Sequence, residues 1–204
     1  MQNPIVILPG IGGSGDDHWQ SIWEGRWRAE NRKVVRLSPP NWDEPRLEDW
    51  LAALDEALKH IGEPAVLVAH SLSCLLVAHW VAKRMAQRAA KRADKAWGQV
   101  LGAFLVAVPD PGGPAFPSQA ASFQSVPRDP LPFATLLVGS QNDPYGSVDY
   151  VNRCARDWRA ACVMAGALGH INTASNLGDW PQGQNLLTAF CAGLTSHCHF
   201  GKGR

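Results

Sequence analysis

Short apolar runs alternate along the chain with longer segments in which apolar residues recur at helical spacing. The runs are rich in branched residues and predict buried strands at residues 5–8, 34–37, 66–69, 100–108, 133–139 and 160–165. The other segments predict helices at residues 16–30, 48–60 and 184–193, and directly after Ser71. Because parallel strands need covered crossovers, this alternation predicts an α/β fold with a mostly parallel, doubly wound sheet and flanking helices.

The organisation of the chain indicates one domain. A length of 204 residues with 46% hydrophobic content is enough for a single core. We expect the domain to cover residues 1–195, with 196–204 as a flexible tail. Residues 109–132 carry seven prolines and little periodicity, which predicts a loop excursion or small lid over the carboxyl edge of the sheet.

The segment VLVAHSLSCLL at residues 66–76 carries the strongest functional signal. Its apolar run leads into Ser71, and a helix-compatible segment follows at once. A strand that turns sharply into a helix at a serine has the geometry of a nucleophile elbow, which exposes the hydroxyl above the sheet edge. The usual spelling is G-x-S-x-G, and here the flanking residues are Ala69 and Ser73, both small. Plain N-capping by the serine is the structural alternative.

A serine nucleophile needs a base, and a carboxylate that orients the base, from elsewhere in the chain. Asp143 follows one later predicted strand and His170 follows the next. The order Ser71, Asp143, His170, with each group on a loop after a strand, is the order of an α/β-hydrolase. Asp110 also follows a predicted strand and is the alternative acid.

A glycine-rich loop at residues 9–15 follows the first predicted strand. A hydrolase of this kind needs a backbone N–H near this position, aimed at the developing oxyanion. We expect the N–H groups of Ile11 and Leu72 to form the oxyanion hole. The loop lacks the G-x-G-x-x-G spacing and the lysine of phosphate-binding loops, and a tight structural turn is the alternative interpretation.

Short motifs occur in order along nearly the whole chain. They are PG at 9–10, DHWQ at 17–20, NWDEP at 41–45, DW at 49–50, AHSL at 69–72, SQNDPY at 140–145, GHIN at 169–172 and GDWP at 178–181. In these motifs the chain resembles the small serine hydrolases typified by retinoblastoma-binding protein 9 and YdeN, within the α/β-hydrolase superfamily. The resemblance implies an α/β-hydrolase fold and a triad of Ser71, Asp143 and His170. The chain departs from the pattern at Ser73, where such proteins commonly have glycine.

Three further residues are candidates for the substrate pocket. His18 lies near the glycine-rich loop, although a histidine at a helix N-terminus is more often structural. Trp42 and Trp180 lie in predicted loops near the active edge of the sheet. Three other tryptophans share one helical face, which favours core packing over a ligand platform: Trp19, Trp23 and Trp27.

Two polar clusters have structural interpretations that we favour. The run at residues 83–95 holds six basic residues against one acidic residue, and we expect a solvated helix extension rather than an anion or nucleic-acid site. His197-Cys198-His199 could ligate a metal, but a frayed terminus is the simpler interpretation. We therefore expect no metal and no cofactor.

Charge, hydropathy and cysteine usage bound the partners and the location. The formal net charge of +1 gives no field that would attract nucleic acid. No apolar run approaches the ~20 residues needed to cross a bilayer, and no charged leader precedes an apolar core. Five scattered cysteines without C-x-x-C spacing indicate a reducing compartment. We expect a cytoplasmic protein without nucleic-acid or membrane partners, and its oligomeric state is open.

These features predict a small serine hydrolase that acts on a small-molecule ester or acyl substrate. A carboxylesterase that works through an acyl-enzyme fits best, because the sequence gives no sign of the extended cleft that a peptide substrate needs. The alternative is a catalytically silent binding protein that keeps the fold, since a fold does not guarantee turnover.

Overall fold

A single parallel sheet of six strands organises the molecule, in the order β2-β1-β3-β4-β5-β6. The computed structural model describes residues 3–91 and 98–197. The strands are β1 (Ile5–Leu8), β2 (Val34–Arg36), β3 (Ala65–His70), β4 (Val100–Val106), β5 (Ala134–Gly139) and β6 (Ala161–Met164). Every neighbouring pair is parallel, so all the loops that follow strands emerge at one edge.

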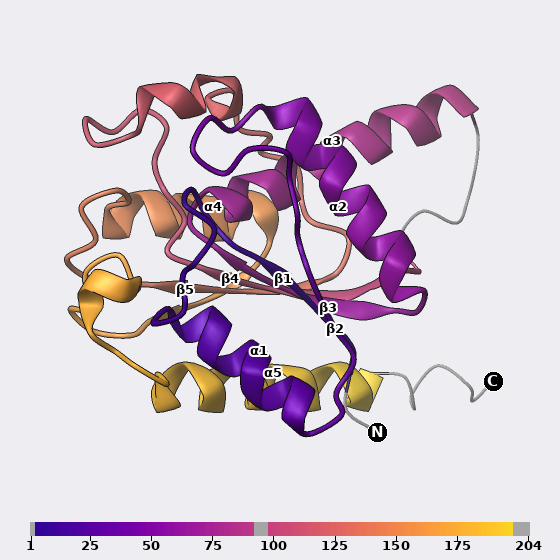
Figure 1. Cartoon of the computed structure of the whole chain (residues 1–204). Coiled ribbons are helices and arrows are strands. Elements are labelled where there is room, and N and C mark those ends of the chain that lie inside the picture. The colour runs from indigo at the N-terminus through magenta and orange to yellow at the C-terminus, as the bar shows by residue number, and fades with distance from the viewer. Residues whose placement is uncertain (1–2, 92–97, 198–204) are drawn as a thin grey trace.

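Helices cover both faces of the sheet (Figure 1). On one face lie α1 (Trp19–Ala29) and α5 (Pro181–His197), and on the other α2 (Leu47–Ile61), α3 (Leu72–Lys91) and α4 (Val148–Trp158). Because both faces are covered, the central strand β3 is buried along its whole length. The predicted doubly wound α/β sheet is thereby confirmed, while the division into 1–195 and a tail stays a prediction.

The predicted elements differ from the observed ones mainly at helices. Helix α4 was not predicted. Its buried residues lie on one face, and its first turn is capped by the Ser147 hydroxyl. The last helix begins at Pro181, earlier than predicted, because proline suits the first helical position. The first helix begins at Trp19 rather than residue 16, because His18 caps it with its side chain.

The proline-rich excursion at residues 109–132 packs back onto the body of the protein. It contains one 3-10 helix, η1 (Ser118–Phe123), in which Ala120 and Phe123 are buried. Phe123 lies edge-on to Trp50 of α2, with ring centroids 5.7 Å apart. The excursion is therefore anchored over the helices of one face, and its earlier part reaches the carboxyl edge of the sheet.

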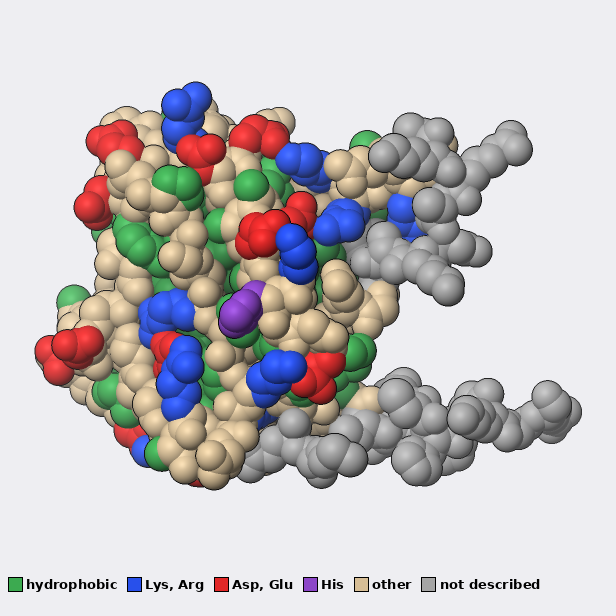
Figure 2. Space-filling view, turned by 45° about the vertical axis from the view of Figure 1, so that its right-hand side comes forward, with side chains coloured by type: hydrophobic (Ala, Val, Ile, Leu, Met, Phe, Trp, Pro, Cys, Tyr) green, Lys and Arg blue, Asp and Glu red, His purple; other side chains and the backbone are tan. Residues whose placement is uncertain are grey.

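Charged side chains of both signs intermingle on the face shown in Figure 2. In the basic run, α3 continues to Lys91, and two of its cations pair with acidic residues of α2: Lys83 with Glu48 and Arg84 with Asp55. No helix in the described part of the chain is long and apolar enough to cross a bilayer. The His197-Cys198-His199 cluster and residues 92–95 of the basic run lie outside the residues whose side chains are described.

Candidate active site

A cavity opens where the chain changes direction across the sheet. From β1 the chain passes to β2 on one side, and from β2 it returns to β3 on the other side, so the loops after β1 and β3 diverge and leave a crevice. The cavity measures about 450 Å³. It is lined by Ile11, Gly12, Ser14, Gly15, His18, His70, Ser71, Leu72, Pro109, Ala115, Phe116, Pro117, Gln119, Tyr145, His170, Asn172 and Thr173.

Ser71 occupies the sharp turn between β3 and α3. Its φ is +55°, in the left-handed region that non-glycine residues rarely adopt. The turn is held by hydrogen bonds at both ends, from the Ser71 N–H to the Val106 carbonyl and from the Cys74 N–H to the Ser71 carbonyl, each 2.9 Å. A Cβ at Gly10 would lie 2.8 Å from the Ser71 Cβ, so glycine there lets the β1 loop approach the serine.

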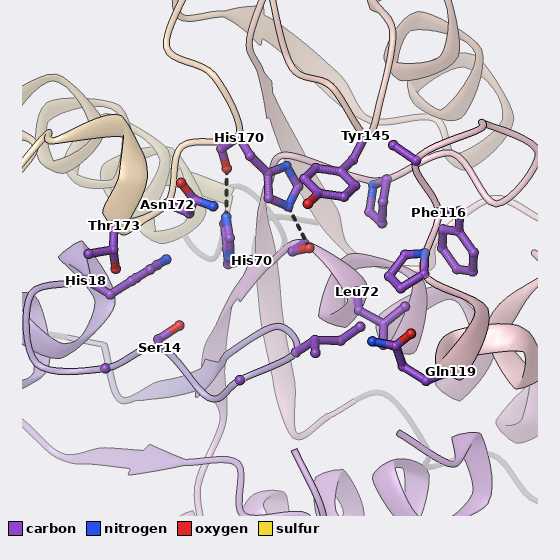
Figure 3. Close-up of a pocket in the computed structure, with 17 residues that line it drawn as sticks. Ser14, His18, His70, Leu72, Phe116, Gln119, Tyr145, His170, Asn172 and Thr173 are labelled. Atoms are coloured by element: carbon purple, nitrogen blue, oxygen red, sulfur yellow. Dashed lines mark hydrogen bonds between the residues drawn. The ribbon is translucent and has the colours of Figure 1, made fainter. Parts of the chain in front are cut away.

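The hydroxyl of Ser71, the imidazole of His170 and the carboxylate of Asp143 form a continuous hydrogen-bonded series. His170 Nε2 lies 2.8 Å from Ser71 Oγ, and His170 Nδ1 lies 2.9 Å from each Asp143 oxygen. Figure 3 shows the His170 imidazole with Tyr145 beside it. The side chains of Asp143 and His170 are only 2% and 9% exposed, so their interaction is shielded from water.

Hydrogen bonds between the loops after β5 and β6 hold these two groups together. The Asn142 Oδ1 accepts from the Gly169 N–H at 2.7 Å and from the Ser140 hydroxyl at 3.0 Å. The Ser140 Oγ in turn accepts from the Leu168 N–H at 2.9 Å. The residues just before His170 are thus fastened to the residues just before Asp143.

The alternative acid, Asp110, has other partners than the imidazole. Its Oδ1 accepts a hydrogen bond from the Gly112 N–H at 2.9 Å, and its Oδ2 lies 3.9 Å from Arg153. The structure therefore brings together Asp143 and His170, and it leaves Asp110 outside the series.

Two backbone amides complete the arrangement. Ile11 and Leu72 both line the cavity beside Ser71, and neither N–H donates a hydrogen bond to another described residue. Leu72 is also the first residue of α3, where N–H groups point out of the helix and the macrodipole favours negative charge. These are the properties that an oxyanion-binding pair requires.

The comparisons with known proteins identify a family for this chain. Residues 5–189 match the serine hydrolase family. The chain belongs to that family.

Individual proteins are also similar to this chain in sequence or in structure. A 74-residue stretch is 36% identical to YdeN of Bacillus subtilis, and it spans 36% of this chain and 39% of YdeN. A solved YdeN-like hydrolase from Pectobacterium atrosepticum is 28% identical, with a TM-score of 0.78 over 95% of this chain and 92% of that one. The structure of the B. subtilis ydeN product, 20% identical, has a TM-score of 0.72 and covers 93% and 99% of the two chains. YdeN and the P. atrosepticum protein are named as hydrolases, and the B. subtilis structure shares the fold of this chain.

Ser73 marks the departure of this serine hydrolase from the glycine that the resemblance leads us to expect. Its side chain is fully buried, and its hydroxyl donates to the Pro9 carbonyl at 2.5 Å. The bond links the first turn of α3 to the loop that carries Ile11. The turn thus accommodates a serine. Its hydroxyl joins the start of α3, which carries the Leu72 N–H, to the loop that carries the Ile11 N–H.

A histidine of the elbow supports the loop of His170. The His70 ring lies 2.9 Å through Nε2 from the His170 carbonyl, and since a carbonyl only accepts, Nε2 carries the hydrogen. Burial lowers the pKa of His70 well below its usual value, which keeps the ring neutral. The series of rings extends to His18, whose centroid lies 4.8 Å from that of His70.

Of the three residues predicted to line the pocket, the structure places one at the cavity. His18 lines it, whereas Trp42 and Trp180 do not appear among the lining residues. Trp42 packs against the loop that follows β1. Its ring lies so close to Gly13 that a Cβ on that residue would be 3.1 Å from the ring. Trp180 is 2% exposed and stacks on Trp23 at a centroid distance of 5.7 Å.

Several lining residues escaped the sequence reading. Tyr145 follows Asp143 by two positions and contacts the His170 ring at a centroid distance of 4.5 Å. Asn172 and Thr173 follow His170 on the same loop. Closeness in sequence to Asp143 and His170 was the signal that could have found these residues. Phe116, by contrast, comes from the proline-rich excursion, whose course no periodicity predicts.

Proposed function

We propose that this member of the serine hydrolase family is a carboxylesterase, with Ser71 as nucleophile, His170 as general base and acid, and Asp143 as orienting carboxylate. The hydrogen-bonded series from Ser71 Oγ through His170 to Asp143 is the observation that carries the proposal. His170 Nε2 lies within hydrogen-bond reach of the Ser71 hydroxyl whose proton it takes, and Asp143 lies within reach of the Nδ1 hydrogen. The alternative of a catalytically silent binding protein gives no reason for that series to be complete.

The first half of the proposed reaction acylates the enzyme. Ser71 Oγ attacks the ester carbonyl carbon while His170 Nε2 takes the hydroxyl proton, and the carbonyl oxygen becomes an oxyanion. The N–H groups of Ile11 and Leu72 hold that oxyanion, and each such donor is worth roughly 3 kcal/mol of barrier. The carbon–oxygen bond to the alcohol then breaks, and His170 gives its proton to the departing alkoxide.

The second half releases the acid. Water attacks the acyl-serine carbonyl, and His170 takes one of its protons. The tetrahedral intermediate collapses, the bond to Ser71 Oγ breaks, and the proton returns to the serine. Throughout, Asp143 accepts from the Nδ1 hydrogen and stabilises the imidazolium. The cycle needs no metal or organic cofactor to balance its atoms and charges.

Esters are favoured over peptides by the size of the site. A cavity of about 450 Å³ suits a small molecule held in one pocket rather than an extended chain. Two solved proteins of the same fold are named for ester chemistry: a monoacylglycerol lipase from Paleococcus ferrophilus, 13% identical with a TM-score of 0.66, and an esterase domain from Rhodothermus marinus, 14% identical with a TM-score of 0.66.

Hydrolysis of p-nitrophenyl butyrate by the wild type and by Ser71→Ala tests the proposal. We expect the variant to lose activity by about 10⁴-fold or more while keeping its melting temperature. The matched control is Ser125→Ala, an exposed serine of the proline-rich excursion that does not line the cavity, and it should retain wild-type rates. Turnover retained by Ser71→Ala would exclude Ser71 as the nucleophile.

A cytoplasmic location belongs to the same proposal. The four described cysteines are unpaired thiols, two of them buried: Cys74, Cys154, Cys162 and Cys191. Burial raises the pKa of the Cys74 thiol well above its usual value, so it is an inert packing group. This usage of cysteine is typical of a reducing compartment.

A further inference from the structure

The lining of the cavity contains no acidic residue and no lysine or arginine. Of the 17 residues that line it, none is Lys, Arg, Asp or Glu. The cavity therefore offers no counter-ion to a charged substrate, which would lose its hydration without compensation on entry. An uncharged ligand meets no such cost.

The uncharged lining is divided into two walls (Figure 3). On one side lie Leu72 and Phe116, with the exposed Gln119 beside them, and Pro109 and Pro117 also line the cavity. On the other side lie groups that form hydrogen bonds: Ser14, His18, Asn172 and Thr173. An ester that fits this cavity has one apolar half and one polar half.

His18 supplies the polar wall with a donor of fixed position. Its Nδ1 accepts a hydrogen bond from the Gln20 N–H at 3.1 Å, so the hydrogen of the neutral ring must lie on Nε2. Burial, aided by the positive charge of Arg36, lowers the pKa of His18 to about 4, so the ring stays neutral at physiological pH. The side chain is 3% exposed, and its Nε2 has no partner among the described residues.

The position of His170 decides which half of the ester the polar wall receives. The leaving oxygen must lie within reach of His170 Nε2 to be protonated. Asn172 and Thr173 follow His170 on the same loop and continue the polar wall from it. The alcohol half thus lies toward this wall, and the acyl half lies against Leu72 and Phe116.

We infer that the substrate is an uncharged ester of a small apolar acid with a hydroxylated alcohol, and that the Nε2–H of His18 donates a hydrogen bond to that alcohol. The inference rests on the proposed esterase function. It adds the class of both halves of the substrate and a specificity residue that does not take part in the proton transfers.

The test compares glycerol 1-butyrate with propyl butyrate, which has the same three-carbon alcohol without the two free hydroxyls. We expect the wild type to prefer the glycerol ester by about tenfold or more in kcat/KM, and His18→Asn to reduce that preference by about tenfold. Asparagine retains an acceptor that can cap α1, and its shorter side chain places no donor at the position of Nε2. The variant therefore separates the donor from the structural role, and its melting temperature checks the fold. Butyrylcholine, which has a cation in place of the hydroxyls, should be the poorest of the three.

Each contrary result has a distinct meaning. An equal preference in the wild type and His18→Asn overturns the role of His18, and efficient turnover of butyrylcholine overturns the uncharged class. A change confined to propyl 3-hydroxybutyrate against propyl butyrate would place the polar half on the acyl side and reverse the assignment of the walls. If no ester is hydrolysed, labelling of Ser71 by a fluorophosphonate separates the cases: with labelling only the substrate class fails, and without it the esterase function fails too.

Discussion

The loops after β4 and β5 begin alike and end in different environments. Asp110 lies four residues beyond the end of β4, and Asp143 lies four residues beyond the end of β5. The Asp143 side chain is 2% exposed and meets His170 at 2.9 Å, whereas the Asp110 side chain is 26% exposed and lies 3.9 Å from Arg153. Although both residues lie four positions after a strand, Asp143 pairs with a buried imidazole and Asp110 pairs with a cation at the surface.

The difference comes from what each loop is bonded to. The β5 loop is joined to the β6 loop through Ser140 and Asn142, and the β6 loop carries the imidazole. The β4 loop leads instead into the proline-rich excursion, and Asp110 stabilises its first turn through the Gly112 N–H. The neighbouring loop, rather than the strand, decides which aspartate can act on His170.

The largest expected effect separates the two carboxylates directly. Asp143→Asn removes the charge that stabilises the imidazolium and allows the wrong tautomer, and we expect kcat/KM for p-nitrophenyl butyrate to fall by about 10⁴-fold. Steady-state kinetics at pH 7.5, with a melting temperature as the check on folding, measure the effect. A loss of less than tenfold would remove Asp143 from the proposed triad.

Low pH is expected to lower the free energy of unfolding through the buried histidines. Burial lowers the pKa of His18 to about 4, and it also lowers the pKa of His70 well below its usual value. In the unfolded chain both histidines titrate near 6.5. The unfolded chain binds more protons between these values, so the free energy of unfolding is highest above pH 6.5 and falls as the pH drops toward 4. For His18 alone the loss is on the order of 3 kcal/mol.

Urea unfolding at pH 7, 5.5 and 4.5 measures this loss. His18→Asn should show a shallower decline than the wild type, because asparagine does not titrate. If the variant loses stability with pH as steeply as the wild type, His18 is not the neutral buried group described above.

A smaller effect tests the link between the loops. Asn142→Ala removes the acceptor shared by the Gly169 N–H and the Ser140 hydroxyl, and we expect kcat to fall by about tenfold as the His170 loop loosens. Asn142→Asp keeps the acceptor oxygen and should recover most of the rate. Gln141→Ala, at the neighbouring exposed position, is the control; an equal loss in that variant would contradict a specific role for Asn142.

The smallest expected effect is at the other aspartate. Asp110→Asn keeps the acceptor for the Gly112 N–H and weakens only the distant, exposed pairing with Arg153, which is worth little. We expect kcat/KM within about twofold of the wild type. A loss comparable to that of Asp143→Asn would mean that the two carboxylates exchange roles in solution.

Much of the fold could be predicted because its strands are buried on both sides. Runs such as those of β3 and β5 are apolar except for His70 and Thr135, and that pattern can be recognised without knowledge of tertiary contacts. Helix α4 was missed because its apolar residues are few and lie between polar ones. Its packing against β5 and β6, which the sequence does not display, is what stabilises it.

The candidate site could likewise be predicted only in part. Ser71, Asp143 and His170 lie in the turn or loops that follow β3, β5 and β6, and those strands are predictable from their apolar residues. The walls of the cavity come from the loop after His170 and from the excursion around Phe116, where turns and prolines leave no periodic signal. The structural role of Ser73 was also hidden, because its partner is a backbone carbonyl 64 positions earlier in the chain.

Labelling with a fluorophosphonate probe, followed by mapping of the adduct by mass spectrometry, tests the central claim most directly. The probe reports an activated serine whatever the natural substrate is. We predict a single adduct on Ser71 in the wild type and its loss in His170→Ala, because the imidazole must take the serine proton. A folded wild-type protein that takes up no label, or takes it up at another serine, would contradict the account and favour a binding protein that retains only the fold.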